Sequence, residues 1–263
     1  MIVTGIDAGQ TATKAVIMRD GQVASYSVLP AGGEITAVVA EQALRQAAEG
    51  AGISVNDVSD IGFIAATGSG RKSVPFAKQK TPELACLAKA TGWLFPSSKT
   101  VIDIGAEKCL ALQISGGRTL NFALNDKCAA GSGAFLETVA DMLHLPLDDI
   151  GPLSLRSQEA LEIKNTCVVF AESEIISLIH AKKAREDILR GVFEGLALSI
   201  YSLMTRIGVE QDVVMVGGVA KNIGMVKALE KHVGLDIIVP DNPEIAGALG
   251  AALVALEKGE TKT

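Results

Sequence analysis

The sequence predicts an α/β protein built from two copies of one unit, each a mixed β-sheet with helices. Two observations support this. The segments that begin at Asp7-Ala-Gly9 and Asp103-Ile-Gly105 align without a gap at an offset of 96 residues. Further along each copy, a short apolar strand runs into a glycine-rich turn, at Gly68 and at Gly217. Self-similarity of this kind indicates an internal structural repeat.

The first copy begins with a hairpin. An apolar strand reaches Asp7, a second strand includes residues 15–18, and the pair Asp20-Gly21 is a typical hairpin turn. Helical periodicity follows over residues 35–49, and an apolar strand starts at Ile61. A hairpin extended by such a βα unit gives a mixed sheet.

The second copy repeats this order over a longer stretch. Its hairpin turn is Gly116-Gly117, and a long helix is predicted around residues 187–207. A helix of small residues over 244–256 is expected to pack back on the first copy. We therefore predict a first ATPase-like lobe at residues 1–97 plus 244–263, and a second lobe at 98–243.

Composition narrows the classes of function. A length of 263 residues allows two lobes with cores of their own. A net charge of -6 argues against nucleic acid as the main partner. No apolar run approaches the ~20 residues of a membrane span, and the first residues already form a strand. Four widely spaced cysteines suit a reducing compartment, so we expect a cytoplasmic protein without a signal peptide.

The loop from Asp7 to Lys14 has the composition of a polyphosphate site. Glycine lets backbone N–H groups approach oxygens, threonine hydroxyls add donors, and a carboxylate holds Mg²⁺ through its waters. Asp103-Ile-Gly105 offers a second carboxylate and turn, and Gly217-Gly218 allows close approach of an adenosine. A single Asp-x-Gly is usually an ordinary turn. Two at matching places in a repeat favour a nucleotide between the lobes.

Two cysteines, Cys128 and Cys167, lie just ahead of segments that read as helices. A thiolate at a helix N-terminus is stabilised by unpaired N–H groups and by the helix dipole. The pattern leaves two interpretations open. The cysteines are inert buried thiols, or they bind a metal whose remaining ligands come from elsewhere, such as a second copy of the chain.

The repeat resembles the acetate and sugar kinase/Hsp70/actin superfamily, whose fold has two ribonuclease-H-like lobes that close on ATP. Within it, Asn125-Asp-Lys-Cys-Ala-Ala-Gly-Ser-Gly133 and Thr166-Cys-Val-Val-Phe-Ala-Glu-Ser-Glu174 resemble the ATP-dependent activators of 2-hydroxyacyl-CoA dehydratases and the related subunits of benzoyl-CoA reductase. The likeness runs from Gly5 to about Leu256.

This resemblance implies a homodimer in which Cys128 and Cys167 of each subunit hold one shared [4Fe–4S] cluster. ATP hydrolysis in both subunits would move the helices behind the cluster. One low-potential electron would then pass to a partner iron–sulfur dehydratase or reductase that acts on a CoA ester. The chain would thus be an ATPase coupled to anaerobic electron transfer.

The resemblance also implies roles for the loops. Asp7 and Asp103 would serve Mg²⁺, Gly105 would form the second phosphate turn, and Gly217 and Gly218 would contact the adenosine. The phosphates would be bound by Gln10, Thr11, Ala12, Thr13 and Lys14.

The second loop departs from the Asp-Ile-Gly-Gly-Gln-Asp pattern usual in these activators, because Ala106-Glu107-Lys108 follow Gly105. Glu107 stands where glutamine would orient the attacking water, and it is able to act as a general base. It therefore joins Asp7 and Asp103 as a predicted catalytic residue. Ala106 has less backbone freedom than glycine and Lys108 reverses a charge, so the efficiency of hydrolysis stays open.

Other interpretations remain. The chain fits one ATP-binding subunit of a hetero-oligomeric benzoyl-CoA reductase. It also fits a small-molecule kinase of the same fold without a cluster, or a module that binds nucleotide without hydrolysis. Cys86 and Cys109 are interpreted as structural.

Overall fold

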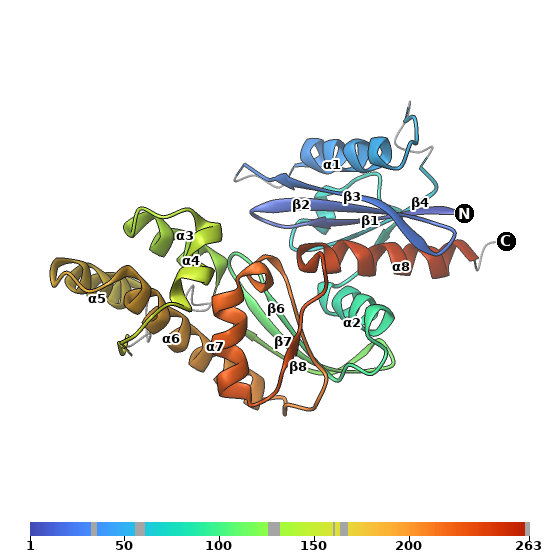
Figure 1. The fold of residues 1–263 in the computed structure, drawn as a ribbon. Helices are drawn as coiled ribbons and strands as arrows, with labels where there is room; N and C mark the ends of the chain where they lie inside the picture. Colours follow the sequence, from blue (N-terminus) through green and yellow to red (C-terminus); the bar gives the residue numbers. More distant parts are fainter. Residues whose placement is uncertain (33–35, 56–60, 126–131, 160, 164–167, 261–263) are drawn as a thin grey trace. The chain divides into compact units, whose positions relative to one another are not determined.

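The computed structural model describes residues 1–32, 36–55, 61–125, 132–159, 161–163 and 168–260. The chain forms two compact units (Figure 1). The first lobe consists of Met1–Pro96, Ser115–Thr119 and Glu244–Thr263, and the second lobe of Ser97–Ile114 and Leu120–Pro243.

The first lobe contains a five-stranded mixed sheet with strand order β3-β2-β1-β4-β5. Its strands are β1 (Ile2–Ala8), β2 (Ala12–Arg19), β3 (Gln22–Pro30), β4 (Phe63–Thr67) and β5 (Gln79–Lys80). β1 runs antiparallel to β2 and parallel to β4. The mixed sheet predicted from the hairpin and the later strand is therefore confirmed in this lobe.

The turns of the two hairpins confirm their sequence signals. Asp20 and Gly21 both have positive φ, at 52° and 79°. In the second hairpin, Gly116 and Gly117 have φ of 54° and 71°. Two consecutive residues of positive φ are what a two-residue type I′ hairpin requires, and only Gly, Asn and Asp adopt them readily.

Helices cover both faces of the first sheet. α1 (Ala37–Gly50) packs on β2 and β3, whereas α8 (Ala246–Glu260) packs on β1 and β4 (Figure 1). α2 (Glu83–Leu94) packs against α8, and a short 3₁₀ helix, η2 (Arg71–Ser73), follows β4. The C-terminal helix thus completes the core of the N-terminal lobe, as its small residues predicted.

The small residues of α8 allow contact between backbones. A Cβ atom added at Gly5 of β1 would lie 2.0 Å from the carbonyl oxygen of Ala248 in α8. A Cβ atom added at Gly250 would lie 1.9 Å from the carbonyl oxygen of Cys86 in α2. α8 therefore lies against a strand on one side and a helix on the other, with no room for a side chain at either glycine.

The second lobe repeats the sheet, with strand order β10-β9-β6-β7-β8. Its strands are β6 (Thr100–Ile104), β7 (Cys109–Ser115), β8 (Arg118–Asn125), β9 (Val213–Val216) and β10 (Ile237–Ile238). Its helices are α3 (Gly133–Met142), α4 (Leu147–Ser154), α5 (Val168–His180), α6 (Arg185–Thr205), α7 (Ile223–Val233) and a short 3₁₀ helix, η3 (Gly218–Lys221). Another 3₁₀ helix, η4 (Pro243–Ile245), begins at the end of the second lobe and leads into α8. β6 is antiparallel to β7 and parallel to β9, as β1 is to β2 and β4.

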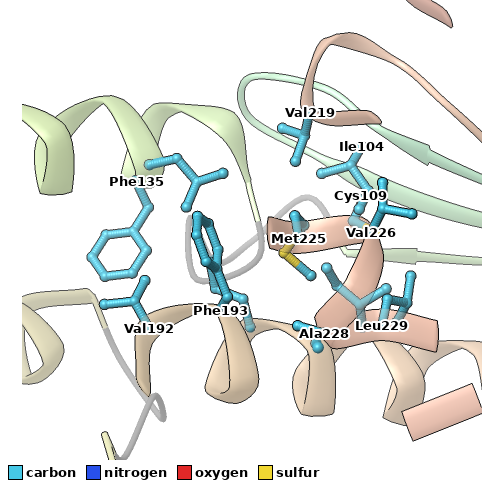
Figure 2. Close-up of a cluster of buried hydrophobic side chains, with 14 of the residues drawn as sticks. Ile104, Cys109, Phe135, Val192, Phe193, Val219, Met225, Val226, Ala228 and Leu229 are labelled. Carbon is cyan, nitrogen blue, oxygen red and sulfur yellow. The ribbon is translucent and has the colours of Figure 1, made fainter. Parts of the chain in front are cut away.

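The long helix α6 forms the centre of the second core. Figure 2 shows Val192 and Phe193 of α6 among side chains from α3 and α7, including Phe135 and Leu229. Of the described helices, α6 is the one whose length and hydropathy also suit a membrane span, but 56% of that stretch is buried in the protein. Its apolar composition is explained by this burial.

The contact at Gly5 gives a stability prediction. Gly5→Ala should lower the free energy of unfolding by about 3 kcal/mol, because overpacking against a backbone carbonyl leaves no flexible atom to move. Chemical denaturation monitored by circular dichroism measures this change. Gly218→Ala is the matched control, because a Cβ atom there meets nothing within 4 Å. Equal stabilities of the two variants would contradict the packing described for α8.

Candidate nucleotide-binding site

The first loop is a tight turn between β1 and β2. The N–H of Gly9 donates to the carbonyl of Ala12 at 3.2 Å. A Cβ atom at Gly9 would lie 2.8 Å from that carbonyl oxygen and 3.4 Å from the Lys14 Nζ. Glycine is therefore required by the close approach of the two strands.

The predicted phosphate residues of this loop differ in exposure. Gln10 and Thr11 are exposed, and Ala12 and Lys14 are half-buried. Thr13 is buried, with 1% of its surface exposed, because β2 begins at Ala12 and Thr13 points to the protein interior. Gln10 and Thr11 are thus the members of this set that are most open to a ligand.

Asp7 lies at the end of β1 and is nearly buried. Its Oδ2 is 3.4 Å from the Lys14 Nζ. Its carboxylate also lies against two glycines: an added Cβ would be 2.4 Å from Oδ1 at Gly68 and 3.0 Å from Oδ2 at Gly247. Gly247 is the second residue of α8, so the carboxylate sits at the positive end of the helix dipole. The site thus holds a negative charge with a cation and a helix N-terminus beside it.

The second lobe contains the same contact. Gly217 has φ of 86°, and a Cβ there would lie 2.4 Å from Oδ1 of Asp103 and 2.5 Å from the carbonyl oxygen of Ile104. In the first lobe, Gly68 has φ of 87°, with distances of 2.4 Å to Asp7 Oδ1 and 2.6 Å to the Ala8 carbonyl. The internal repeat therefore extends to the geometry of the two carboxylates.

The lobes differ in the charge beside each carboxylate. Asp7 pairs in register with Lys14 across the first hairpin, whereas Asp103 pairs with Leu110, which is buried. The lysine that sequence analysis placed near phosphate thus has an apolar counterpart in the second lobe.

The second loop closes in the same way as the first. The Gly105 N–H donates to the Lys108 carbonyl at 3.0 Å, which matches the Gly9 to Ala12 bond. The side chain of Glu107 is exposed at the tip of this loop, and that of Lys108 is half-buried. Glu107 is therefore accessible to solvent and to a ligand.

Gly217 and Gly218 lead from β9 into η3. The Gly217 N–H donates to the Pro243 carbonyl at 2.9 Å, and a Cβ on Gly218 would meet no atom within 4 Å. A cavity of about 420 Å³ adjoins η3 and has both charged and apolar walls, formed by residues that include Lys221, Ile223, Lys227, Glu230, Val239 and Asp241. Its volume is in the range of small-molecule sites.

The two predicted metal ligands, Cys128 and Cys167, lie outside the described residues. The helices expected after them are present: α3 begins at Gly133, and α5 begins at Val168. In the described parts of the chain, no group of three or more His, Cys, Asp or Glu side chains is placed to hold a metal ion.

The other two cysteines are buried. Burial raises the pKa of Cys86 to about 12. Burial, together with the negative charge of Asp103, also raises the pKa of Cys109 far above its ordinary value. Both thiols are therefore protonated at neutral pH, which agrees with a structural role.

One residue of the site was missed by sequence analysis. Gly247 was assigned only to a small-residue helix, and its contact with Asp7 joins positions far apart in the chain. The signal that was available is its place in the first turn of a helix expected to pack on the first copy. A residue that must lie close to a carboxylate there has to be small.

These features define the class of the protein by its fold: two mixed sheets with helices, as in the actin, Hsp70 and ROK-like ATPase fold. The chain belongs to the BadF/BadG/BcrA/BcrD ATPase family, which matches residues 4–255. The predicted fold class and family resemblance are thereby confirmed.

Relatives cover the whole chain. It is 39% identical to the activator of lactoyl-CoA dehydratase from Anaerotignum propionicum, over 100% of both proteins. It is similar in structure to the activator of the 2-hydroxyisocaproyl-CoA dehydratase from Clostridium difficile with bound ADPNP, with a TM-score of 0.92 and 37% identity over 100% of this chain and 97% of the other. A more distant relative is one of the subunits of benzoyl-CoA reductase from Thauera aromatica, 30% identical over 96% of this chain and 92% of the relative.

The raised pKa values predict the reactivity of the buried thiols. At pH 8, alkylation of Cys86 by iodoacetamide should be about a thousandfold slower than that of a free cysteine, because only the thiolate reacts and a higher pKa lowers its fraction. Mass spectrometry of peptides from native and urea-unfolded protein measures both sites. Rapid labelling of Cys86 or Cys109 in the native protein would show that they are not core residues.

Proposed function

We propose that this chain is an ATP-hydrolysing activator that delivers a low-potential electron to a partner iron–sulfur enzyme acting on a CoA ester. The observation that carries this proposal is the matched pair of carboxylate contacts, Asp7 with Gly68 and Asp103 with Gly217. They occur in a chain whose full-length relative is named as an activator of a CoA-ester dehydratase.

The two carboxylates would hold Mg²⁺ through water, since Mg²⁺ keeps several of its waters when it binds with substrate phosphates. Gln10 and Thr11 are exposed in the loop that follows Asp7 and would donate to phosphate oxygens. The Lys14 ammonium lies 3.4 Å from Asp7. A bound Mg²⁺ would compete for the same carboxylate, so Lys14 would turn to a phosphate as a point charge.

The second loop would supply the base. Glu107 is exposed at the tip of the loop that follows Asp103 of β6, and the bond from the Gly105 N–H to Lys108 closes that loop. A carboxylate at this place would take a proton from the attacking water or orient it. The adenosine would lie against Gly218, where an added Cβ would meet no atom within 4 Å. The cavity is lined by Ala220 and Lys221, which follow in η3.

The thiols available in one chain fit half of an iron–sulfur cluster. Clusters of this type take four cysteine thiolates. Cys86 and Cys109 are buried with raised pKa values, which leaves Cys128 and Cys167. Two thiolates from each subunit of a homodimer would hold one shared [4Fe–4S] cluster, and a bound cluster would supply one-electron transfer at low potential. In the sequence of each subunit, Cys128 precedes α3 and Cys167 precedes α5.

A second candidate function is one ATP-binding subunit of a hetero-oligomeric benzoyl-CoA reductase. The relative from Thauera aromatica favours it, and Glu107 and Lys108 would suit a specialised subunit. The higher identity to a dehydratase activator favours the first candidate. A small-molecule kinase of this fold would use the loops but would leave Cys128 and Cys167 without a role.

The decisive experiment is iron and sulfide analysis of the protein purified without oxygen, together with its oligomer mass and its rate of phosphate release. A homodimer with about four irons per dimer that hydrolyses ATP supports the proposal. A chain that is stable only with a different partner chain indicates the reductase assembly. A protein without iron–sulfur absorption indicates the kinase, and one without phosphate release indicates a binding module.

Substitution of the cysteines tests the cluster. Cys128→Ala or Cys167→Ala removes two ligands per dimer, so iron should fall to near zero while nucleotide binding persists. Iron content and calorimetry with Mg-ADPNP measure the two effects. Cys86→Ala is the matched control and should keep its iron. Retention of a full cluster in either ligand variant would exclude the assignment.

Asp7→Asn tests the nucleotide loop. Loss of the charge beside Lys14 should weaken Mg-ATP binding by about tenfold or more, which corresponds to about 1.4 kcal/mol, and should leave the iron content unchanged. Calorimetry at fixed Mg²⁺ measures the affinity. Asp20→Asn, which alters an exposed carboxylate, should bind like the unaltered chain. Unchanged affinity of Asp7→Asn would remove Asp7 from the site.

A further inference from the structure

The second phosphate loop is bonded to the first turn of α3. The N–H of Gly133 donates to the carbonyl of Gly105 at 2.9 Å, and the N–H of Ala134 donates to the carbonyl of Ala106 at 2.9 Å. N–H groups in the first turn of a helix have no acceptor within the helix. The side chain of the N-cap residue, Ser132, makes no capping hydrogen bond. The loop itself therefore caps α3.

Gly133 is enclosed at this junction. An added Cβ would lie 3.2 Å from Cγ2 of Val219, 3.3 Å from the carbonyl oxygen of Gly105 and 3.4 Å from Cα of Ala106. Val219 belongs to η3, which follows Gly217. The start of α3 is thus held between the loop of Asp103 and the turn that lies against the Asp103 carboxylate.

The described residues of the first lobe do not form this arrangement. By the offset of the repeat, the carbonyls equivalent to those of Gly105 and Ala106 belong to Gly9 and Gln10. In the described part of the first lobe, no helix N-terminus donates to either of them. Among the described residues, the hydrogen bonds between a phosphate loop and a helix N-terminus therefore occur in the second lobe, which also contains Cys128 and Cys167.

α3 also connects the two cysteine segments. Cys128 precedes Gly133 by five residues in the sequence. Further along α3, Phe135, Leu136 and Val139 share one buried cluster with Ala171 and Ile175 of α5, the helix that begins one residue after Cys167. A displacement of the first turn of α3 therefore acts on the chain next to both cysteines.

We propose that Gly133 is a positioning residue that couples the second phosphate loop to the cysteine segments. This inference rests on the proposed function. A change in the loop when phosphate binds or leaves moves the carbonyls of Gly105 and Ala106. Because Gly133 has no free space toward Val219, α3 follows the loop or both hydrogen bonds break. The state of the nucleotide is in this way transmitted through two backbone hydrogen bonds and the packing of Gly133 against Val219.

Two substitutions of Gly133, with a third at Val219 as a rescue, separate the effect of the hydrogen bond from that of the packing. Gly133→Ala adds a Cβ against Val219, and Val219→Ala in the same chain relieves the closest contact. Gly133→Pro adds similar bulk and also removes the N–H that donates to Gly105. Proline is favoured at the first helical position, and Ser132 has the extended backbone (φ −121°, ψ 162°) that proline requires of the preceding residue.

The primary measurement is hydrogen exchange of residues 132–142 and 168–180 in the full-length protein, with and without saturating Mg-ADPNP. We expect nucleotide to slow exchange in both helices of the unaltered chain by about fivefold or more, the lower end of typical coupling. Gly133→Pro should bind Mg-ADPNP and lose this effect. Gly133→Ala should lose part of it, and Gly133→Ala with Val219→Ala should regain it.

A full nucleotide effect in Gly133→Pro, or none in the unaltered chain with nucleotide bound, would overturn the inference. If Gly133→Pro does not fold, the alanine variant and its rescue decide the question alone. The exchange measurement needs no iron. A chain that lacks a cluster but shows the effect refutes the proposed electron transfer and keeps the coupling. With a cluster present, the rate of iron removal by a chelator, with and without Mg-ADPNP, should change in parallel.

Discussion

The contact between a strand-end aspartate and a glycine on the neighbouring parallel strand is the constraint on which the site depends. Asp7 lies opposite Thr67, and Asp103 lies opposite Val216, so the next residue of each neighbouring strand meets the carboxylate. Only a glycine with positive φ leaves room there. This single contact fixes the register of the parallel pair, the direction of the turn after it and the position of a charge at the sheet edge.

Both copies of the repeat keep this contact, while the two lobes differ around it. The first lobe adds a cation, Lys14, and a helix N-terminus at Gly247, which together stabilise a buried charge. The second lobe has an apolar residue at the equivalent of Lys14, and three helices, α3 to α5, occupy the connection between β8 and α6. In the first lobe, a lysine and a helix N-terminus thus lie beside the carboxylate. In the second lobe, the loop after the carboxylate is instead hydrogen-bonded to the first turn of α3.

The parts of the structure that depend on neighbouring residues were predictable from the sequence. Asp20-Gly21 and Gly116-Gly117 specify hairpin turns, and the offset between Asp7 and Asp103 specifies the repeated sheets. Contacts between distant segments were not predictable, because no local pattern encodes them. The neighbour of Gly133 is Val219, and the neighbour of Gly5 is α8.

The candidate site shows the same division. Its two carboxylates were found from their glycine-containing turns. Thr13 was grouped with the exposed loop, but β2 begins one residue earlier, and the alternation of side chains in a strand places Thr13 inside. Composition identifies a phosphate-binding loop, whereas the exact residue at which a strand begins decides which hydroxyls reach solvent.

The position of α8 has a consequence for biosynthesis. The N-terminal sheet is translated first, but β1 and β4 remain uncovered on one face until residues 246–260 have left the ribosome. Domains generally fold as units during synthesis, with N-terminal ones first, and here the earlier lobe must wait for α8. The nascent chain therefore exposes one face of these apolar strands until α8 has been made, and Gly247 reaches Asp7 only after that. The surroundings of the Asp7 carboxylate are thus complete only once α8 is in place.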